Sequence, residues 1–516
     1  MKRKMFRGIC SLGTGICLVA LVAGPQAVAK EPATPVASAA AIPDRPEKLS
    51  FPPLEFHPPK AAPYRVPLKN GPVAYIVPDR ELPLVTITLY IHTGDWVEPV
   101  GKEGLTDLCG SLLTRGGTEK RTAQELEERL AFLAAQLGSS IRGAEGTVSL
   151  NLLSKDLDEG LAILREVLTA PRFQQDRIDL QKQQMLQNMQ QRNDDSKTIE
   201  SNEAGYLAYG ENFWDNRHQT AASVAAITRA DLLAFQKQWF WPSNFVLAVA
   251  GDFDREVMVQ KLDQLFANWP WHGTPPPPIP QDIKMADAGV YLVDKDVNQG
   301  RVSMQLPGIM RDNPDYWALI VMNDILGGGG FTSRIVNRVR SDEGLAYSAG
   351  SSFPGGVYFP YAFTASFQSK SRSVAYAASI VIEEMKRIAA EPVTLEELDN
   401  SKRGYIERLP RSFASKLQVA NVLAYEEFTG RFAKDPDYWQ QVVPRIIAVT
   451  QADVQRVAKK YLTPDRLVLL GVGQKDEILK GDPNHPVAFT NLVGGKFKEL
   501  PLRDPLTMKP MPLPGK

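Results

Sequence analysis

The sequence is poor in cysteine and histidine, the two residue types that most often reveal metal or covalent chemistry. It has three cysteines and five histidines in 516 residues. Cys10 and Cys17 lie in an apolar N-terminal stretch, so an exported chain cut after that stretch keeps only Cys109 and forms no internal disulfide. No two histidines are close enough to share a helical turn, which excludes a helical pair of metal-binding imidazoles. The histidines are His57, His92, His218, His272 and His485.

An excess of charge of either sign is also absent. Lys and Arg together number 59, as do Asp and Glu, so no net field favours nucleic acid or an anionic membrane surface. A hydrophobic content of 43% argues against disorder, and 516 residues exceed what one hydrophobic core usually serves. We therefore expect a globular protein of at least two domains, whose partners must be inferred from local sites.

The first 29 residues have the organisation of a cleavable secretory signal. Basic residues at positions 2, 3, 4 and 7 precede an apolar stretch over 9–23 and a small-residue triplet at 27–29. A retained anchor is the alternative, but the apolar stretch is short for a membrane span. Ile16 before Cys17 does not suit a lipid anchor. We expect an exported protein without a stable membrane anchor, periplasmic if the source cell has an outer membrane and secreted otherwise.

Proline-rich stretches divide the rest of the chain. Residues 30–63 form a Pro/Ala-rich lead-in, and residues 272–284 include four consecutive prolines, which favour a stiff linker. The division predicts an N-terminal domain over 64–271, a C-terminal domain over 285–475 and a C-terminal tail over 476–516.

The two predicted domains share a residue pattern at a constant offset of 222 positions. In each domain, a helix opened by threonine precedes a proline-marked turn and an apolar strand that ends at glycine. We expect these strands over 246–250 and 467–472, and earlier strands over 73–77 and 290–293. The domains therefore look duplicated. The matched residues are Thr228, Ala230, Asp231, Pro242 and Gly251 in the first domain, and Thr450, Ala452, Asp453, Pro464 and Gly473 in the second.

Local patterns in the first domain predict a helix followed by a strand. Thr122 and Glu125 have the spacing of a capping box. Leucines at 126, 130, 133 and 137 repeat at helical spacing, and we expect this helix to end at Gly138. Alternating apolar and polar residues over 147–152 predict a strand with one covered face.

A second capping box, at Thr394 and Glu397, begins another amphipathic helix in the second domain. Strands mixed with long helices in both domains predict an α+β fold with two homologous halves. Each half is expected to be a mostly antiparallel sheet backed by helices.

The segment 104–118 is where catalytic residues are expected. It follows a predicted strand over 85–91 and is interpreted as a helix closed by two glycines. The strand, the Gly104-Leu105 start and the Gly117-Thr118 end resemble the pitrilysin/insulinase-type peptidases, whose helix carries an inverted His-x-x-Glu-His motif. The resemblance covers nearly all of the mature chain and implies two halves that form a clam-shaped cavity.

The family's zinc ligands are missing at the corresponding positions. The motif needs two histidines on one helix face and a glutamate as general base, where this chain has Asp107, Gly110 and Ser111. By the resemblance, a later helix supplies the third ligand, and Asn188 stands there. An amide is a poor zinc ligand, so we expect no metal in this chain. A harder cation at Asp107 and Ser111 is an alternative, as is a polar stripe that faces the cavity.

Cys109 is a second candidate for chemistry because a lone cysteine can act as a nucleophile. It lies between Leu108 and Gly110 on the predicted helix, and the nearest histidine, His92, belongs to the preceding strand. A catalytic thiol needs a base or a helix N-terminus to lower its pKa. Burial in the helix packing is the favoured interpretation.

A glycine-rich segment over 326–348 is the most distinctive motif of the second domain. It lacks the Gly-Lys-Ser/Thr and G-x-G-x-x-G settings of nucleotide-binding loops. It resembles the peptidase family's C-terminal signature, in which an arginine and a tyrosine seven residues later reach the substrate; here these are Arg340 and Tyr347. Arginine offers a fork of donors and tyrosine a hydroxyl for a developing oxyanion. The alternative is that Arg340 forms a salt bridge and Tyr347 packs.

The resemblance implies a subunit without zinc that completes the site of a heteromeric metallopeptidase. Arg340 and Tyr347 would contact an extended peptide, and zinc is expected in a homologous exported partner with an intact His-x-x-Glu-His motif. Hydrolysis would then belong to the complex. A stand-alone protein that binds peptides by strand addition, or acts as a scaffold, is the alternative. A third hypothesis, an enzyme that uses another site, has only Cys109 in its support.

Overall fold

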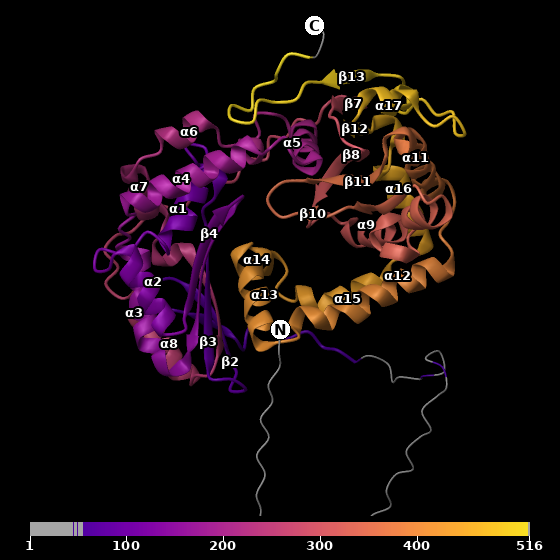
Figure 1. Cartoon of the computed structure of the whole chain (residues 1–516). Helices are drawn as coiled ribbons and strands as arrows, with labels where there is room; N and C mark the ends of the chain where they lie inside the picture. The colour runs from indigo at the N-terminus through magenta and orange to yellow at the C-terminus, as the bar shows by residue number, and fades with distance from the viewer. Residues whose placement is uncertain (1–44, 46–48, 50–54, 514–516) are drawn as a thin grey trace, which may run out of the picture. The chain divides into compact units, whose positions relative to one another are not determined.

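A computed structural model of the chain describes residues 45, 49 and 55–513 (Figure 1). Residues Glu55–Lys516 form one compact unit that includes both predicted domains. The expected signal over 1–29 and nearly all of the lead-in up to residue 54 lie outside the described residues. Among the helices that the structure describes, none is long and apolar enough to cross a membrane.

The first half contains a six-stranded sheet in the order β1-β2-β6-β3-β5-β4. All neighbouring strands are antiparallel except β2 and β6, which are parallel. Strand β6 is buried along almost its whole length, as its unbroken apolar sequence indicates. The strands are β1 (Arg65–Pro67), β2 (Val73–Pro78), β3 (Leu84–Ile91), β4 (Gln136–Arg142), β5 (Glu145–Leu153) and β6 (Phe245–Gly251).

Helices of the first half build a continuous core against this sheet, with leucines of β3 and β5 among its buried members. Thr122 and Glu125 form the expected capping box at the start of α2, because each side chain bonds the other's backbone N–H. The helices are α1 (Leu105–Leu113), α2 (Ala123–Phe132), α3 (Leu157–Thr169), α4 (Gln175–Gln190), α5 (Ser196–Tyr209), α6 (Ala221–Ala226), α7 (Arg229–Trp239) and α8 (Arg255–Phe266).

The second half contains a sheet in the order β13-β7-β12-β8-β11-β9, and β10 also pairs with β8. The strands from β12 to β9 are antiparallel neighbours, whereas β13, β7 and β12 run parallel. The strands are β7 (Gly289–Asp294), β8 (Gln299–Met310), β9 (Ala346–Ser352), β10 (Gly355–Gly356), β11 (Tyr361–Lys370), β12 (Val468–Gly473) and β13 (Phe497–Leu500).

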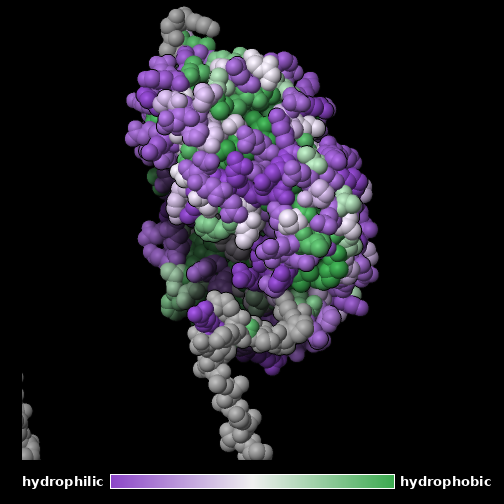
Figure 2. All heavy atoms as spheres, turned by 90° about the vertical axis from the view of Figure 1, so that its right-hand side faces the viewer, coloured by the Kyte–Doolittle hydropathy of each residue, from purple (hydrophilic) through white to green (hydrophobic). Residues whose placement is uncertain are grey.

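Helices also cover the second sheet, so the predicted α+β fold with two sheets backed by helices is confirmed. Polar side chains cover most of the face formed by these helices, and hydrophobic residues appear there in separate patches (Figure 2). The helices are α9 (Tyr316–Asn323), α10 (Arg334–Val336), α11 (Val374–Ala390), α12 (Leu395–Arg408), α13 (Lys416–Phe428), α14 (Arg431–Lys434), α15 (Tyr438–Ala448), α16 (Gln451–Tyr461) and α17 (Lys475–Lys480).

The repeated pattern corresponds to repeated structure. Helices α7 and α16 both begin with a threonine capping box, at Thr228 and Thr450. Each is followed by a short 3-10 turn at the expected proline and by a buried strand, β6 or β12. The expected capping box at Thr394 also begins α12.

Each half lends one helix to the other half's sheet. Helix α13 packs against β2 and β6 of the first sheet, and Val419, Ala420 and Leu423 are buried there. Helix α5 packs against β12 and β8 of the second sheet through Ile199 and Leu207 (Figure 1). The two halves are therefore joined by apolar cores as well as by the connecting segment.

One sequence prediction was wrong. The helix expected to run to Gly138 ends at Phe132, and Leu137 lies in β4, opposite Leu150 of β5. Ala134 has φ 50°, a left-handed conformation that breaks the helix before the strand begins. The leucine spacing misled because Leu133 and Leu137 face the same core from two different elements.

The predicted tail over 476–516 contributes to both halves. Strand β13 extends the second sheet through parallel pairing with β7. The segment after it returns to the first half, where the Arg503 guanidinium binds Glu203 at 2.6 Å and the Leu506 carbonyl accepts the Ala221 N–H at 2.8 Å. The end of the chain thus ties the second sheet to the helices of the first half.

Candidate substrate-binding site

Helix α1 lies so close to β4 that position 110 has no room for a side chain. A Cβ built on Gly110 would lie 2.5 Å from the Ile141 backbone nitrogen and 3.0 Å from the Ser140 carbonyl carbon. The Ser139 hydroxyl donates to the Gly110 carbonyl and holds the two elements together. The residue that corresponds to the motif's general base is therefore a packing glycine.

Asp107 and Ser111, the other two positions of the degenerate motif, make local contacts. Asp107 forms an ion pair with Arg142 on β4, with 3.2 Å between the carboxylate oxygen and the guanidinium nitrogen. The Ser111 hydroxyl donates to the Leu108 carbonyl of its own helix at 3.3 Å. Both side chains therefore bind neighbouring residues of the first half.

Asn188 lies on α4, which contacts α1, but its side chain is exposed. Its neighbours Met185 and Met189 face the core instead. Within residues 45, 49 and 55–513, no group of three or more His, Cys, Asp or Glu side chains is placed to hold a metal ion. Of positions 107, 110, 111 and 188, only Asp107 carries a side chain of a type that zinc prefers, and one carboxylate does not make the four-ligand tetrahedral set of a zinc site.

Cys109 is fully buried in the core of the first half. Burial raises the pKa of its thiol well above the usual range, because a thiolate loses its hydration there. A thiol in this setting is not a nucleophile. The third functional hypothesis therefore loses its only support.

Arg340 and Tyr347 come together at the surface of the second half. Arg340 lies in a π-helical turn over Asn337–Asp342, and Tyr347 lies on the edge strand β9. The guanidinium carbon is 4.7 Å from the centre of the Tyr347 ring and 4.4 Å from that of Phe331. Within the described part of the chain, this guanidinium makes no hydrogen bond or ion pair, so the salt-bridge alternative finds no support.

The two rings that flank Arg340 are unusually exposed for aromatic side chains. Tyr347 is 85% exposed and Phe331 is 66% exposed. Cation–π contacts with these two rings hold the guanidinium in place, while its N–H donors have no hydrogen-bond partner among the described residues. This arrangement can present a fixed fork of donors and one phenolic hydroxyl to a ligand outside this half.

The sequence analysis missed a group of buried carboxylates at the start of α1. Glu98 accepts hydrogen bonds from the Gly104 and Thr106 backbone N–H groups, at 3.1 and 2.7 Å. The Thr106 hydroxyl lies within hydrogen-bond distance of both Glu98 and Asp95. Burial raises the pKa of Glu98 to about 7 and also raises the pKa of Asp95. Gly104, the N-cap residue of α1, has no side chain to cap the helix, and the carboxylate of Glu98 takes that role.

A cavity of about 390 Å³ lies at the β4–β5 turn, where both halves contribute to its lining. Glu145 and Asp215 supply its carboxylates, and the rest of the wall is mainly aromatic. No sequence motif indicated this cavity, because its members come from segments far apart in the chain. The aromatic members are Tyr209, Trp214, Tyr358, Phe359, Tyr361 and Tyr425.

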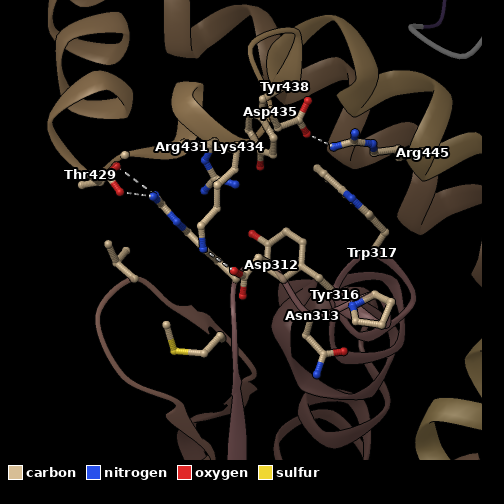
Figure 3. Close-up of a pocket in the computed structure, with 15 residues that line it drawn as sticks. Asp312, Asn313, Tyr316, Trp317, Thr429, Arg431, Lys434, Asp435, Tyr438 and Arg445 are labelled. Atoms are coloured by element: carbon tan, nitrogen blue, oxygen red, sulfur yellow. Dashed lines mark hydrogen bonds and ion pairs between the residues drawn. The ribbon is translucent and has the colours of Figure 1, made fainter. Parts of the chain in front are cut away.

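A second cavity, of about 460 Å³, lies within the second half between β8, α9 and the segment from α13 to α15 (Figure 3). All four cationic side chains of its lining are paired with carboxylates. The charged side chains of this cavity therefore form ion pairs that hold the α13–α15 segment together and against β8 and α9. The pairs are Arg311 and Arg431 with Glu426, Lys434 with Asp312, and Arg445 with Asp435.

Comparison with known sequences gives matches in both halves. A profile described as "Insulinase (Peptidase family M16)" matches residues 76–204, and one described as "Peptidase M16 inactive domain" matches residues 226–405. An uncharacterised zinc protease of Streptomyces coelicolor is 24% identical over 399 residues, which cover 73% of this chain and 82% of that protein. An uncharacterised zinc protease of Rickettsia bellii is 26% identical over 422 residues, 77% of this chain and 94% of the relative.

Solved structures show the same fold. A peptidase M16 inactive domain from Pseudomonas fluorescens superposes with a TM-score of 0.71 at 24% identity and covers 80% of this chain and 97% of its own. The periplasmic protease PqqL from Escherichia coli gives a TM-score of 0.67 at 16% identity, over 80% of this chain and 45% of that one. Among sequence relatives, a probable mitochondrial-processing peptidase subunit beta of Arabidopsis thaliana is 23% identical over 273 residues, which cover 50% of this chain and 50% of that protein.

Proposed function

Since the chain belongs to the M16, or insulinase, family of peptidases, we propose that it is the zinc-free subunit of a two-chain peptidase. In this proposal, Arg340 and Tyr347 contact a peptide held beside a partner's zinc. The observation that carries the proposal is the surface cluster in which two exposed rings contact the Arg340 guanidinium, which has no ion-pair partner among the described residues. Such a cluster has no role in the core of its own half.

Helix α1 lacks a set of zinc ligands, which also supports a complex in which the partner binds the zinc. Gly110 is packed against β4, and Asp107 is engaged with Arg142, so the helix supplies neither a general base nor a zinc ligand. Water activation in M16 peptidases depends on zinc bound by this motif. In the proposed complex, zinc and hydrolysis therefore belong to the partner.

The chemistry of Arg340 and Tyr347 suits contact with a peptide at the moment of cleavage. A guanidinium fork can hold a peptide carbonyl or carboxylate, and a phenol can donate to the oxyanion that develops during attack by water. Both groups would act only if the partner's site faces them. An exposure of 85% for Tyr347 leaves its hydroxyl open to such a surface.

The proposed partner is a homologous protein with an intact His-x-x-Glu-His motif, exported to the same compartment. One relative is named as the beta subunit of mitochondrial-processing peptidase, which suits a family in which chains act as subunits. A structural neighbour is described as periplasmic, which suits the exported location proposed here.

The proposal is tested by mixing the purified chain with candidate partners from the same cell and measuring peptide hydrolysis. Hydrolysis should rise well above that of either chain alone, and metal analysis should find zinc only in the partner. Arg340→Ala should lower the turnover of the mixture while co-purification persists. Arg403→Ala, a change at an exposed arginine of α12, is the matched control and should leave turnover unchanged.

A second function, peptide binding without cleavage, is favoured by the edge strand β4. Among the described strands, β4 pairs only with β5, so its other edge is free to add an extended peptide. This function predicts that the isolated chain binds peptides and that no partner raises hydrolysis. That result would replace the two-chain proposal.

A further inference from the structure

The cavity at the β4–β5 turn has a wall that suits a cation. Six aromatic side chains line it, together with two carboxylates, Glu145 and Asp215. Aromatic faces carry negative quadrupole charge and attract cations most strongly where water is displaced. Phe359 packs edge-on against Tyr209 at 5.3 Å and against Trp214 at 5.8 Å, so the rings are fixed by one another.

The negative charge of this cavity is not compensated within the described residues. Neither Glu145 nor Asp215 forms a salt bridge there, in contrast to the fully paired cavity of the second half. Among the described residues of the lining, Arg142 is the only cationic one, but its side chain is 76% exposed and pairs with Asp107. A positively charged ligand would provide the cationic partner that these two carboxylates lack within the described residues.

Two polar atoms of the cavity residues also lack partners. The Oε2 atom of Glu145 and the hydroxyl of Tyr358 are both buried and make no hydrogen bond to any residue that the structure describes. A buried polar atom without a partner typically costs about 1–3 kcal/mol, and more if it is charged. Burial accordingly raises the pKa of Glu145, although contact with the Tyr425 hydroxyl opposes the shift.

We infer that this cavity binds the basic side chain, guanidinium or ammonium, of a peptide that lies along β4. This inference rests on the second proposed function, peptide binding at the open edge of β4, and names its substrate class: peptides with an arginine or lysine at the residue that reaches the cavity. Glu145 pairs with the side chain as its counter-ion, the tyrosine and tryptophan rings enclose the charge, and the exposed Asp215 adds a second carboxylate.

The position of the cavity favours a peptide over a free amine. Glu145 begins β5 directly after the turn and stands opposite Arg142, the last residue of the edge strand β4. A peptide strand added to the open edge of β4 would therefore pass this end of the hairpin, where the cavity begins. Backbone pairing would supply affinity, and the cavity would select the side chain.

The test uses the full mature chain alone and two short capped alanine–serine peptides that differ at one central residue. One peptide carries arginine and the other carries citrulline, which has nearly the same shape without the charge. Binding is measured by calorimetry and by the change in tryptophan fluorescence, to which Trp214 of the cavity lining contributes. The arginine peptide should bind at least about tenfold more tightly, as expected from loss of a desolvated cation–π and ion-pair contact.

Glu145→Gln should remove that preference, and Glu119→Gln, at an exposed glutamate outside the cavity, should retain it. Equal affinity for the two peptides, or no binding of the arginine peptide, overturns the inference. The arginine–citrulline comparison on the unaltered chain decides the matter even if Glu145→Gln fails to fold. Because no partner is present, this result is separate from the hydrolysis test, and either inference can fail without the other.

Discussion

The close approach of α1 to β4 makes a sharp prediction for Gly110→Ala. The new methyl carbon would lie 2.5 Å from the Ile141 nitrogen, about 1 Å inside an ordinary contact, and the obstacle is backbone rather than a flexible side chain. Overpacking of this kind costs about 1–3 kcal/mol. Alanine recovers up to about 1 kcal/mol through its better helix propensity. We expect a net loss of about 1–2 kcal/mol.

Gly404→Ala is the matched control. Gly404 lies inside α12, and the nearest atom to its added Cβ is the Arg408 guanidinium nitrogen at 3.9 Å, which is ordinary contact. Only the propensity gain remains there, so we expect stabilisation by about 0.5–1 kcal/mol. The same substitution in two helices should thus shift stability in opposite directions.

The assay is urea unfolding followed by tryptophan fluorescence, with both variants compared with the unaltered chain at one pH. The unfolding midpoint should fall for Gly110→Ala and rise for Gly404→Ala. If Gly110→Ala is as stable as Gly404→Ala, the close α1–β4 contact is refuted. A confirmed loss would also mean that the glutamate of a zinc motif cannot be placed at 110 unless α1 and β4 separate.

Further predictions concern buried charges and the buried thiol. Because burial raises the pKa of Glu98 from 4.5 to about 7, the folded state holds this proton more tightly, so the free energy of unfolding should fall by on the order of 3 kcal/mol as pH rises from about 4.5 to about 7. Glu98→Gln should flatten that part of the stability–pH profile measured by urea unfolding, and an unchanged slope would contradict the assignment. Arg503→Ala leaves Glu203, which is 5% exposed, buried without its partner and should cost about 3–5 kcal/mol, measured against Arg403→Ala as the exposed control. Cys109 should react with a thiol reagent only at the rate of unfolding, and rapid labelling of the native chain would show that the core is open.

Local sequence signals predicted much of the fold. The capping boxes at Thr122 and Thr394 form as their spacing indicates, because each motif satisfies backbone groups within four residues. The alternating strand over 147–152 also holds, since one face is covered and the other is not. The leucine repeat failed at Leu137 because helical spacing cannot distinguish one long helix from a helix and a strand that share a core.

The candidate site was only partly predictable. Arg340 and Tyr347 are close in sequence, and the motif predicted that they act together. The contact of Phe331 with Arg340 was not predictable, because it depends on the fold of the glycine-rich segment. Glu145 and Tyr358 meet because α5 and α13 cross to the other half's sheet and bring the halves together. No periodicity in one chain encodes such a long-range exchange of helices. Likewise, the sequence shows a glycine at 110 but not the strand that requires it.

The central claim is that this chain supplies substrate contacts to zinc held elsewhere, and Tyr347→Phe tests it most directly. The change removes one hydroxyl and little packing, because the ring is 85% exposed and its contact with Arg340 is through the ring face. In a purified complex with the zinc-bearing partner, turnover should fall by about 10²–10³ while assembly and peptide affinity stay unchanged. Full turnover in a complex shown to be intact would contradict the claim and leave this chain as a peptide-binding scaffold.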